Sequence, residues 1–365
     1  MTCTQSQSID IFCRVIDNFG DAGVMWRLAR ALHAEGFAVR LIIDEPGTLK
    51  YLAGCLQNCP TEKIGEAEGI TVCLWEKDWD EGACTLQCAD VVIEGFACRL
   101  PPDYQHRMSQ RKPKWFNIDY FSAEDWIEGC HLVPSIDPTS GLIKINYFPG
   151  VTPASGGLII ENDYEKDKAA FEKSSPKDDR ALNIFFFAYP YGPIEAIVRA
   201  LNELNYPIKL SISKSEAGSL LNSALDKLNA RGIHRTLLPF VAQKDFDPLL
   251  WKSDVAFVRG EDSAARAMIA GVPFLWHIYH QDDEVHMVKL RALQNRLKPY
   301  FKDEKLFDTW CELQEMMNQG RFSAPSLKKL IDNLVDWRQA TEAFATDLRQ
   351  MGSLSRKLSQ IIKNG

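Results

Sequence analysis

Charged and hydroxyl side chains gather at one predicted turn in the second half of the chain. The apolar residues 255–258 predict a buried strand, and the helix-forming residues 264–270 predict the helix that follows it. The turn between them carries Arg259, Glu261, Asp262 and Ser263. A helix N-terminus offers free N–H groups and the positive end of its dipole, and an arginine adds aligned donors, which together suit a diphosphate. The turn is therefore a candidate anion site, although an ordinary strand-to-helix connection with an acidic first turn has the same spacing.

Two carboxylates flank the turn that follows the first predicted strand. We expect a strand over residues 8–16, a turn bounded by Asp17 and Asp21, and a helix over residues 24–35. The turn lacks the glycine fingerprint of a dinucleotide site, and its anions would repel a phosphate. It suits a cationic or hydroxyl-bearing acceptor instead, whereas capping of the helix by Asp21 is the alternative interpretation.

Aromatic and amide side chains follow two further predicted strands. Phe187 and Tyr189 end one of these strands, where their rings could wall a sugar or a base. Gln243 and Phe246 follow the other, and an exposed ring beside an amide is a natural platform for a pyrimidine base. Packing in the core is the alternative for each aromatic residue.

Neither the histidines nor the cysteines predict a metal site. His277, His280 and His286 lie near acidic residues, but His277 alternates within a predicted strand and fits a core position. The 10 cysteines include no pair with the two-residue gap typical of zinc knuckles, and most of them lie beside apolar residues. We expect the cysteines to be buried free thiols. We also expect no metal or other cofactor, because Arg259 and the helix N-terminus can neutralise a leaving diphosphate without a metal ion.

A basic run interrupts this otherwise acidic chain. It consists of Arg99, Arg107, Arg111, Lys112 and Lys114. A solvated surface is the usual explanation of such a run, and a guide for an acidic protein partner is the functional one.

The overall composition excludes several classes of protein. The chain has 365 residues, of which 45% are hydrophobic and 25% charged, and its formal net charge is −7. This length allows two domains, and the negative charge argues against a nucleic-acid-binding protein. No apolar run reaches the length that spans a membrane, and the N-terminus has no basic region before an apolar core. We therefore expect a cytoplasmic protein.

Two consecutive series of strands and helices must position the candidate side chains. Each series begins with a strand–helix–strand pattern, which predicts a parallel sheet. We expect an N-terminal Rossmann-like domain over residues 1–160, a charged linker over 161–180, a C-terminal Rossmann-like domain over 181–345, and a C-terminal helix over 346–365. The N-terminal domain is one surface on which this last helix can pack. In such a fold the ligand binds in a cleft between the two facing domains, at the C-terminal ends of the strands.

The motifs together resemble the EarP family, the protein-arginine rhamnosyltransferases that modify elongation factor P. The resemblance spans nearly the whole chain and is carried by Asp17-Asn18-Phe19-Gly20-Asp21, residues 120–126, residues 148–150, Gly156-Gly157 and Arg259-Gly260-Glu261-Asp262-Ser263. It implies a GT-B fold, dTDP-β-L-rhamnose as the donor, an arginine of elongation factor P as the acceptor, and inversion of the anomeric centre. The chain has Phe19 where tyrosine is common in the family, and both residues are aromatic.

The resemblance also implies roles for individual residues. Asp17 and Asp21 serve the acceptor, with Asp21 the first choice as base, and Glu261 acts through ribose or rhamnose hydroxyls. The other donor-binding residues are Asn18, Phe19, Gly20, Phe187, Tyr189, Gln243, Phe246, Arg259, Asp262, Ser263 and Tyr279, with Gln243 and Phe246 near thymine. A GT-B nucleotide-sugar epimerase, a nicotinamide-dependent oxidoreductase and a non-catalytic protein-binding module are the alternatives. An epimerase would turn over the donor alone, and an oxidoreductase would need the absent glycine fingerprint.

Overall fold

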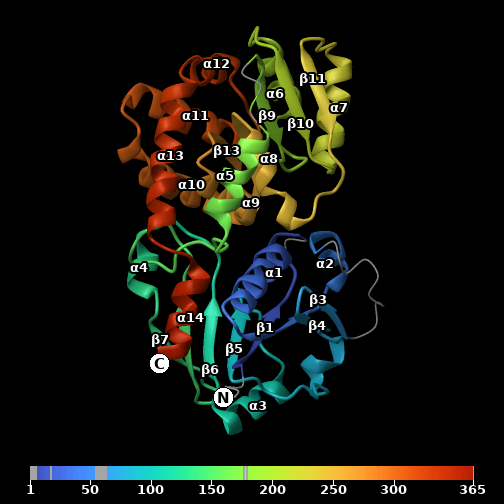
Figure 1. Cartoon of the computed structure of the whole chain (residues 1–365), viewed down its shortest axis with the longest axis vertical. Coiled ribbons are helices and arrows are strands. Elements are labelled where there is room, and N and C mark those ends of the chain that lie inside the picture. The colour runs from blue at the N-terminus through green and yellow to red at the C-terminus, as the bar shows by residue number, and fades with distance from the viewer. Residues whose placement is uncertain (1–5, 17–18, 54–63, 176, 178–179, 365) are drawn as a thin grey trace. The chain divides into compact units, whose positions relative to one another are not determined.

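The computed structural model describes residues 6–16, 19–53, 64–175, 177 and 180–364, and the chain divides into two compact units (Figure 1). Unit 1 comprises Met1–Asn162 and Met351–Gly365, and unit 2 comprises Asp163–Gln350. Each unit contains its own sheet, so both predicted α/β series are present.

Unit 1 is built on a sheet whose described strands lie in the order β3-β4-β2-β1-β5-β6-β8-β7. The strands are β1 (Ser8–Cys13), β2 (Ala38–Ile43), β3 (Ile64–Ala67), β4 (Ile70–Leu74), β5 (Val91–Gly95), β6 (Lys114–Ile118), β7 (Pro134–Ile136) and β8 (Ile143–Tyr147). Neighbouring strands are parallel, apart from the antiparallel pairs β3–β4 and β7–β8. The chain order reverses between β1 and β5, and ligands of open parallel sheets bind beside such a reversal, at the C-terminal ends of the strands.

Apolar side chains cover both faces of the unit 1 sheet. Side chains alternate along a strand, so Ile9 and Ile11 pack on one face while Phe12 packs on the other. The helices of this unit are α1 (Phe19–Ala34), α2 (Pro46–Leu52), α3 (Pro102–Arg111), α4 (Trp126–Cys130) and α14 (Leu354–Asn364). Helices α1 and α14 share the core that contains Ile9 (Figure 1), and Tyr104 of α3 packs with Phe12. The last helix of the chain therefore belongs to the core of unit 1.

Unit 2 is built on a parallel sheet whose described strands lie in the order β11-β10-β9-β12-β13. The strands are β9 (Leu182–Phe186), β10 (Ile208–Ile212), β11 (Ile233–Leu237), β12 (Val255–Arg259) and β13 (Phe274–His277). Strands β9 and β12 are buried along nearly their whole length, which matches their continuous apolar runs. The chain order reverses between β9 and β12, so the C-terminal ends of these two strands are the expected ligand position in this unit.

The helices of unit 2 include one within residues 161–180, the segment predicted to be a charged linker. They are α5 (Tyr164–Ser174), α6 (Ile194–Asn202), α7 (Glu216–Lys227), α8 (Asp247–Lys252), α9 (Gly260–Ala270), α10 (Val285–Leu297), α11 (Glu304–Asn318), α12 (Ala324–Asp332) and α13 (Leu334–Gln350). Helix α5 packs beside α8 through Tyr164, whose hydroxyl accepts a hydrogen bond of 2.9 Å from the Trp251 indole. Helix α13 continues to Gln350, where unit 2 ends.

Candidate functional site

The turn from β12 into α9 lies at the chain reversal of unit 2. Arg259 is both the last residue of β12 and the N-cap of α9, and Gly260 adopts a φ of 58°, where a side chain would be strained. The Ser263 hydroxyl accepts a hydrogen bond of 2.9 Å from the Arg259 N–H and donates to the Arg259 carbonyl. Ser263 therefore holds the turn in shape, in addition to any contact with a ligand.

The Arg259 guanidinium is held by two aromatic rings. Its central carbon lies 4.5 Å from the ring centroid of Phe187 and 4.7 Å from that of Tyr189. Phe187 follows β9, and its N–H bonds to Phe257 of β12, so the two strands at the chain reversal bring these groups together. Among the described residues, no carboxylate forms an ion pair with Arg259. The structure thus leaves a fixed positive charge with its donors available for an anion.

Tyr189 is itself fixed by surrounding rings. It stacks on Tyr191 at 5.2 Å and meets Tyr279 edge-on at 5.7 Å. Its backbone N–H donates to Nδ1 of the buried His277 at 3.2 Å. Burial, together with His280, Arg259 and His286, lowers the pKa of His277 to about 3, so this ring is neutral at physiological pH. The prediction that His277 is a core residue is confirmed. Because the ring is neutral, it adds no second positive charge beside Arg259.

The predicted base platform combines residues at the end of β9, before α8 and in the first turn of α9. Phe246, at the start of α8, meets Phe187 at 6.2 Å between ring centroids and Phe185 at 5.6 Å, and it is partly exposed. The buried Gln243 donates from Nε2 to a carboxylate oxygen of Asp262 at 3.3 Å. The structure therefore brings Phe187, Phe246, Gln243 and Asp262 to the same end of the sheet.

Glu261 has a partner that sequence reasoning did not identify. Lys289 of α10 donates to its carboxylate at 3.2 Å, and both side chains are mostly buried. The two residues are separated by 28 positions, so no local pattern signals the pair. Lys289 fixes the orientation of Glu261, and a carboxylate held in this way is suited to accept hydrogen bonds from hydroxyl groups.

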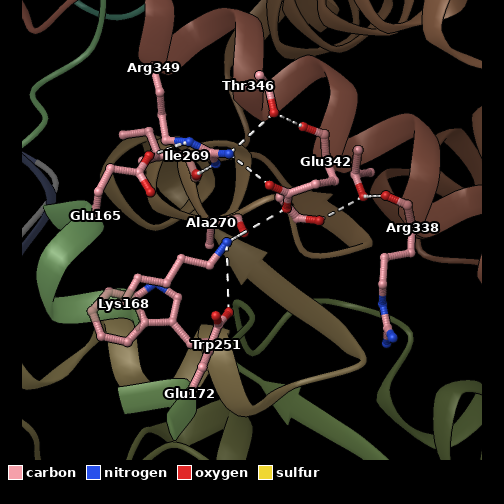
Figure 2. Close-up of polar contacts among 12 residues, drawn as sticks. Glu165, Lys168, Glu172, Trp251, Ile269, Ala270, Arg338, Glu342, Thr346 and Arg349 are labelled. Atoms are coloured by element: carbon pink, nitrogen blue, oxygen red, sulfur yellow. Dashed lines mark hydrogen bonds and ion pairs between the residues drawn. The ribbon is translucent and has the colours of Figure 1, made fainter. Parts of the chain in front are cut away.

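The far end of α9 is anchored by cations from other helices (Figure 2). Arg349 of α13 donates to the Ile269 carbonyl at 2.7 Å and pairs with Glu165 and Glu342, while Lys168 of α5 donates to the Ala270 carbonyl at 3.2 Å. Cations at a helix C-terminus satisfy its free carbonyls and complement its dipole. These contacts stabilise the helix whose N-terminus forms the candidate anion site.

The middle of α9 is fixed by a buried ion pair. Arg266 is 1% exposed, and its Nε donates to Oδ1 of Asp247 at 2.7 Å while its terminal nitrogen bonds the second carboxylate oxygen. Asp247 stands at the start of α8, next to Phe246. The pair therefore ties the candidate anion turn to the candidate base platform.

The acceptor loop of unit 1 is described in part. Asp17 and Asn18 lie outside the described residues, and Phe19 and Gly20 are the first residues of α1. Asp21 is 2% exposed and accepts a hydrogen bond of 2.7 Å from the Ile16 N–H. Asp21 thus shapes the loop from within the first turn of α1 and is not the N-cap, which is the position that the alternative interpretation gave it.

Three cations of the basic run are engaged by partners within unit 1. Arg107 donates to the carbonyls of Leu86 and Cys84, at 2.7 and 2.5 Å. Arg111 pairs with Asp90 at 2.5 Å, and Lys114 donates to the Ile362 carbonyl at 2.5 Å. These three cations serve the packing of α3, β6 and α14, and Arg99 and Lys112 are the exposed members that remain.

The histidines and cysteines are the possible metal ligands that the sequence offers. No group of three or more His, Cys, Asp or Glu side chains among them is arranged to hold a metal ion. The described cysteines are free thiols, most of them buried, as predicted, and Cys130 is exposed. None of the described helices is both long and apolar enough to cross a membrane.

Comparison with known proteins relates both units to one family. Residues 9–363 match the family described as Elongation-Factor P (EF-P) rhamnosyltransferase EarP. The protein-arginine rhamnosyltransferase of Pseudomonas aeruginosa is 35% identical over 97% of this chain and 98% of its own length. That of Neisseria meningitidis serogroup B is 34% identical over 96% of each chain.

Solved structures are similar across the whole fold. The structure described as "Structural basis for EarP-mediated arginine glycosylation of translation elongation factor EF-P" has a TM-score of 0.63 at 24% identity, over 99% of this chain and 100% of that one. MurG of Acinetobacter baumannii has a TM-score of 0.53 at 13% identity, with the same coverage. At these identities the likeness concerns the fold alone, and it confirms the predicted GT-B class with two Rossmann-like sheets and a C-terminal helix.

Proposed function

This chain belongs to the EarP family, and on that premise we propose that it transfers rhamnose from dTDP-β-L-rhamnose to an arginine side chain of elongation factor P, with inversion of the anomeric centre. The same proposal places it in the cytoplasm with its acceptor, a translation factor. The observation that carries the donor half is Arg259, a cation held between two rings above the start of α9 and without a carboxylate partner among the described residues.

The donor half of the proposal assigns each group by its chemistry. Arg259 and the first N–H groups of α9 bind the diphosphate and stabilise the charge that develops on it as it leaves. Phe246 and Gln243 contact thymine, with Phe187 beside them, while Glu261, oriented by Lys289, accepts hydrogen bonds from sugar hydroxyls. These groups need no metal ion to neutralise the leaving group.

The acceptor half depends on the carboxylates of the first loop. A guanidinium has a pKa above about 12 and is a poor nucleophile until it loses a proton. Asp17 and Asp21 hold it through paired hydrogen bonds and align one nitrogen with the anomeric carbon. As the C–N bond forms, the C–O bond to dTDP breaks, dTDP leaves with the electron pair, and the guanidinium proton passes to a carboxylate. Attack opposite the leaving group inverts the centre.

Mass spectrometry of elongation factor P, incubated with the chain and dTDP-rhamnose, tests the proposal as a whole. We expect one added deoxyhexose on an arginine, and no consumption of donor when the acceptor is omitted. Sugar conversion without acceptor would instead indicate an epimerase, and an unmodified acceptor with an intact donor would refute the proposed activity.

The role of Asp21 has its own test. Asp21→Asn keeps an oxygen for the Ile16 N–H but removes the charge, so we expect dTDP binding by calorimetry to be unchanged and transfer to be lost by roughly 100-fold or more. Asp44→Asn is the matched control, because Asp44 also accepts a hydrogen bond from this loop, at 3.0 Å from the Val15 N–H. Equal loss in both variants would show that Asp21 acts only by shaping the loop.

A further inference from the structure

A cavity lies at the chain reversal of unit 1, where open parallel sheets bind their ligands. Its volume is about 530 Å³, and its walls come from the segments that follow β1 and β5. Arg14 and Ile16 represent the first segment, and residues 95–100 the second. Ile16 is also the residue whose N–H bonds to Asp21, so the cavity adjoins the loop that carries the proposed acceptor carboxylates.

The wall that follows β5 is held in an unfavourable backbone conformation. Phe96, Ala97 and Arg99 have φ values of 56°, 52° and 57°, in the left-handed region that residues other than glycine rarely adopt. Two buried side chains maintain it: Asn117 accepts from the Ala97 N–H and Glu94 from the Arg99 N–H, each at 2.9 Å. Strain that the surroundings over-determine in this way is concentrated at functional sites.

The charges around the cavity leave one cation available. Arg14 pairs with Asp80 at 2.5 Å and donates to the Cys98 carbonyl at 3.1 Å, so its charge is neutralised locally. Arg99 is exposed, and its guanidinium has no ion pair or hydrogen bond with any residue that the structure describes. A guanidinium forms paired hydrogen bonds with a planar carboxylate, so this cation fits an acidic side chain of a protein.

The rest of the cavity wall is apolar. Ile16 is 77% exposed, and Phe96 stacks on Tyr120 with ring centroids 4.2 Å apart. Leu100 completes the apolar part of the wall. An occupant must therefore offer both an apolar group and an anion.

We propose that this cavity seats the polypeptide next to the arginine that is modified, with an apolar side chain against Ile16 and Phe96 and a carboxylate of the acceptor protein on Arg99. The inference rests on the proposed function, because that function supplies a protein acceptor. It adds a recognition element outside the carboxylate loop: the enzyme selects its arginine through an acidic neighbour in the acceptor.

The test uses two cations with the same backbone conformation. Arg99 and Lys112 are both exposed and have φ values of 57° and 55°, but only Arg99 lines the cavity. Glycine is favourable at such φ values, so Arg99→Gly and Lys112→Gly both preserve the fold. Steady-state transfer to elongation factor P is measured for each variant, with acceptor and donor varied separately.

We expect Arg99→Gly to raise KM for the acceptor protein at least about tenfold, while kcat and KM for dTDP-rhamnose stay within twofold of the original. Arg99→Glu should raise the acceptor KM further, and Lys112→Gly should change none of these constants. An acceptor KM unchanged in Arg99→Gly, or raised equally in Lys112→Gly, overturns the inference while leaving the proposed function intact.

Direct binding of unmodified elongation factor P, measured by calorimetry, separates the inference from the proposed function. If transfer fails with every acceptor but Arg99→Gly still weakens binding about tenfold, the docking cavity stands and the proposed reaction fails. Absence of any binding by the original chain overturns both.

Discussion

Replacing Arg259 by glutamine should weaken the binding of dTDP in proportion to the phosphate contacts that the guanidinium supplies. In the structure this group lies over Phe187 and Tyr189 and forms no ion pair with a described carboxylate. Binding an anion therefore breaks no existing ion pair, and the full charge-assisted interaction contributes to affinity.

The expected magnitude follows from the exposure of the site. A hydrogen bond to a charged group contributes about 1.5–3 kcal/mol, and the lower half of that range applies because Arg259 is partly exposed and its charge is screened. A loss of about 1.5–2 kcal/mol corresponds to a rise in Kd of roughly 10- to 30-fold. Arg259→Lys keeps the charge but loses the planar fork that lies over the rings, so its Kd should fall between those of the original chain and Arg259→Gln.

Calorimetric titration with dTDP and, separately, with thymidine measures this effect. Thymidine lacks phosphates, so Arg259→Gln should leave its affinity unchanged, and the exposed Arg321 supplies a matched control, Arg321→Gln, for which both affinities stay constant. The reasoning is refuted if dTDP binds Arg259→Gln as tightly as the original chain, or if thymidine and dTDP lose affinity equally.

Two further predictions concern the stability of the donor unit. The pKa of His277 is lowered to about 3, so unfolding takes up a proton between about pH 6.5 and pH 3. The free energy of unfolding is therefore highest above pH 6.5 and falls as the pH drops, by at most about 1.4 kcal/mol per pH unit. In urea unfolding at pH 7.5 and pH 5, His277→Gln should remove this slope, whereas His234→Gln, at an exposed position, should keep it. Asp247→Ala removes the carboxylate that pairs with the buried Arg266 and should cost about 3 kcal/mol in chemical denaturation. A cost below about 1 kcal/mol would contradict the importance of this pair.

Local sequence patterns predicted the scaffold of the site because they encode burial and turn chemistry. The apolar run before Arg259 became β12, and glycine at position 260 provided the φ that the turn needs. The predicted strand that precedes Gln243 forms as β11 over Ile233–Leu237 and ends before Pro239, which has no N–H to donate to a neighbouring strand.

Contacts between distant residues could not be predicted in this way. Lys289 reaches Glu261 across 28 positions, and Arg349 reaches the Ile269 carbonyl across 80. Such pairs depend on how helices pack in three dimensions, which the periodicity of either segment alone does not determine. Closeness in sequence is also a poor guide to function. The charges of the basic run are neighbours in sequence, yet Arg107 donates to backbone carbonyls and is not free to bind a partner protein.

The two chain reversals carry opposite charges, and this difference assigns their ligands. The reversal in unit 2 presents Arg259 and a helix N-terminus, which attract a diphosphate, while the loop at the reversal in unit 1 contains two acidic residues in its sequence, which repel one. A dinucleotide enzyme would need a glycine fingerprint and an anion site at the first strand, and this chain has carboxylates there instead. Arg99 is consistent with the same assignment: in an acidic unit, one unpaired cation beside the cavity can select a carboxylate of the acceptor without drawing the donor phosphates to the first loop.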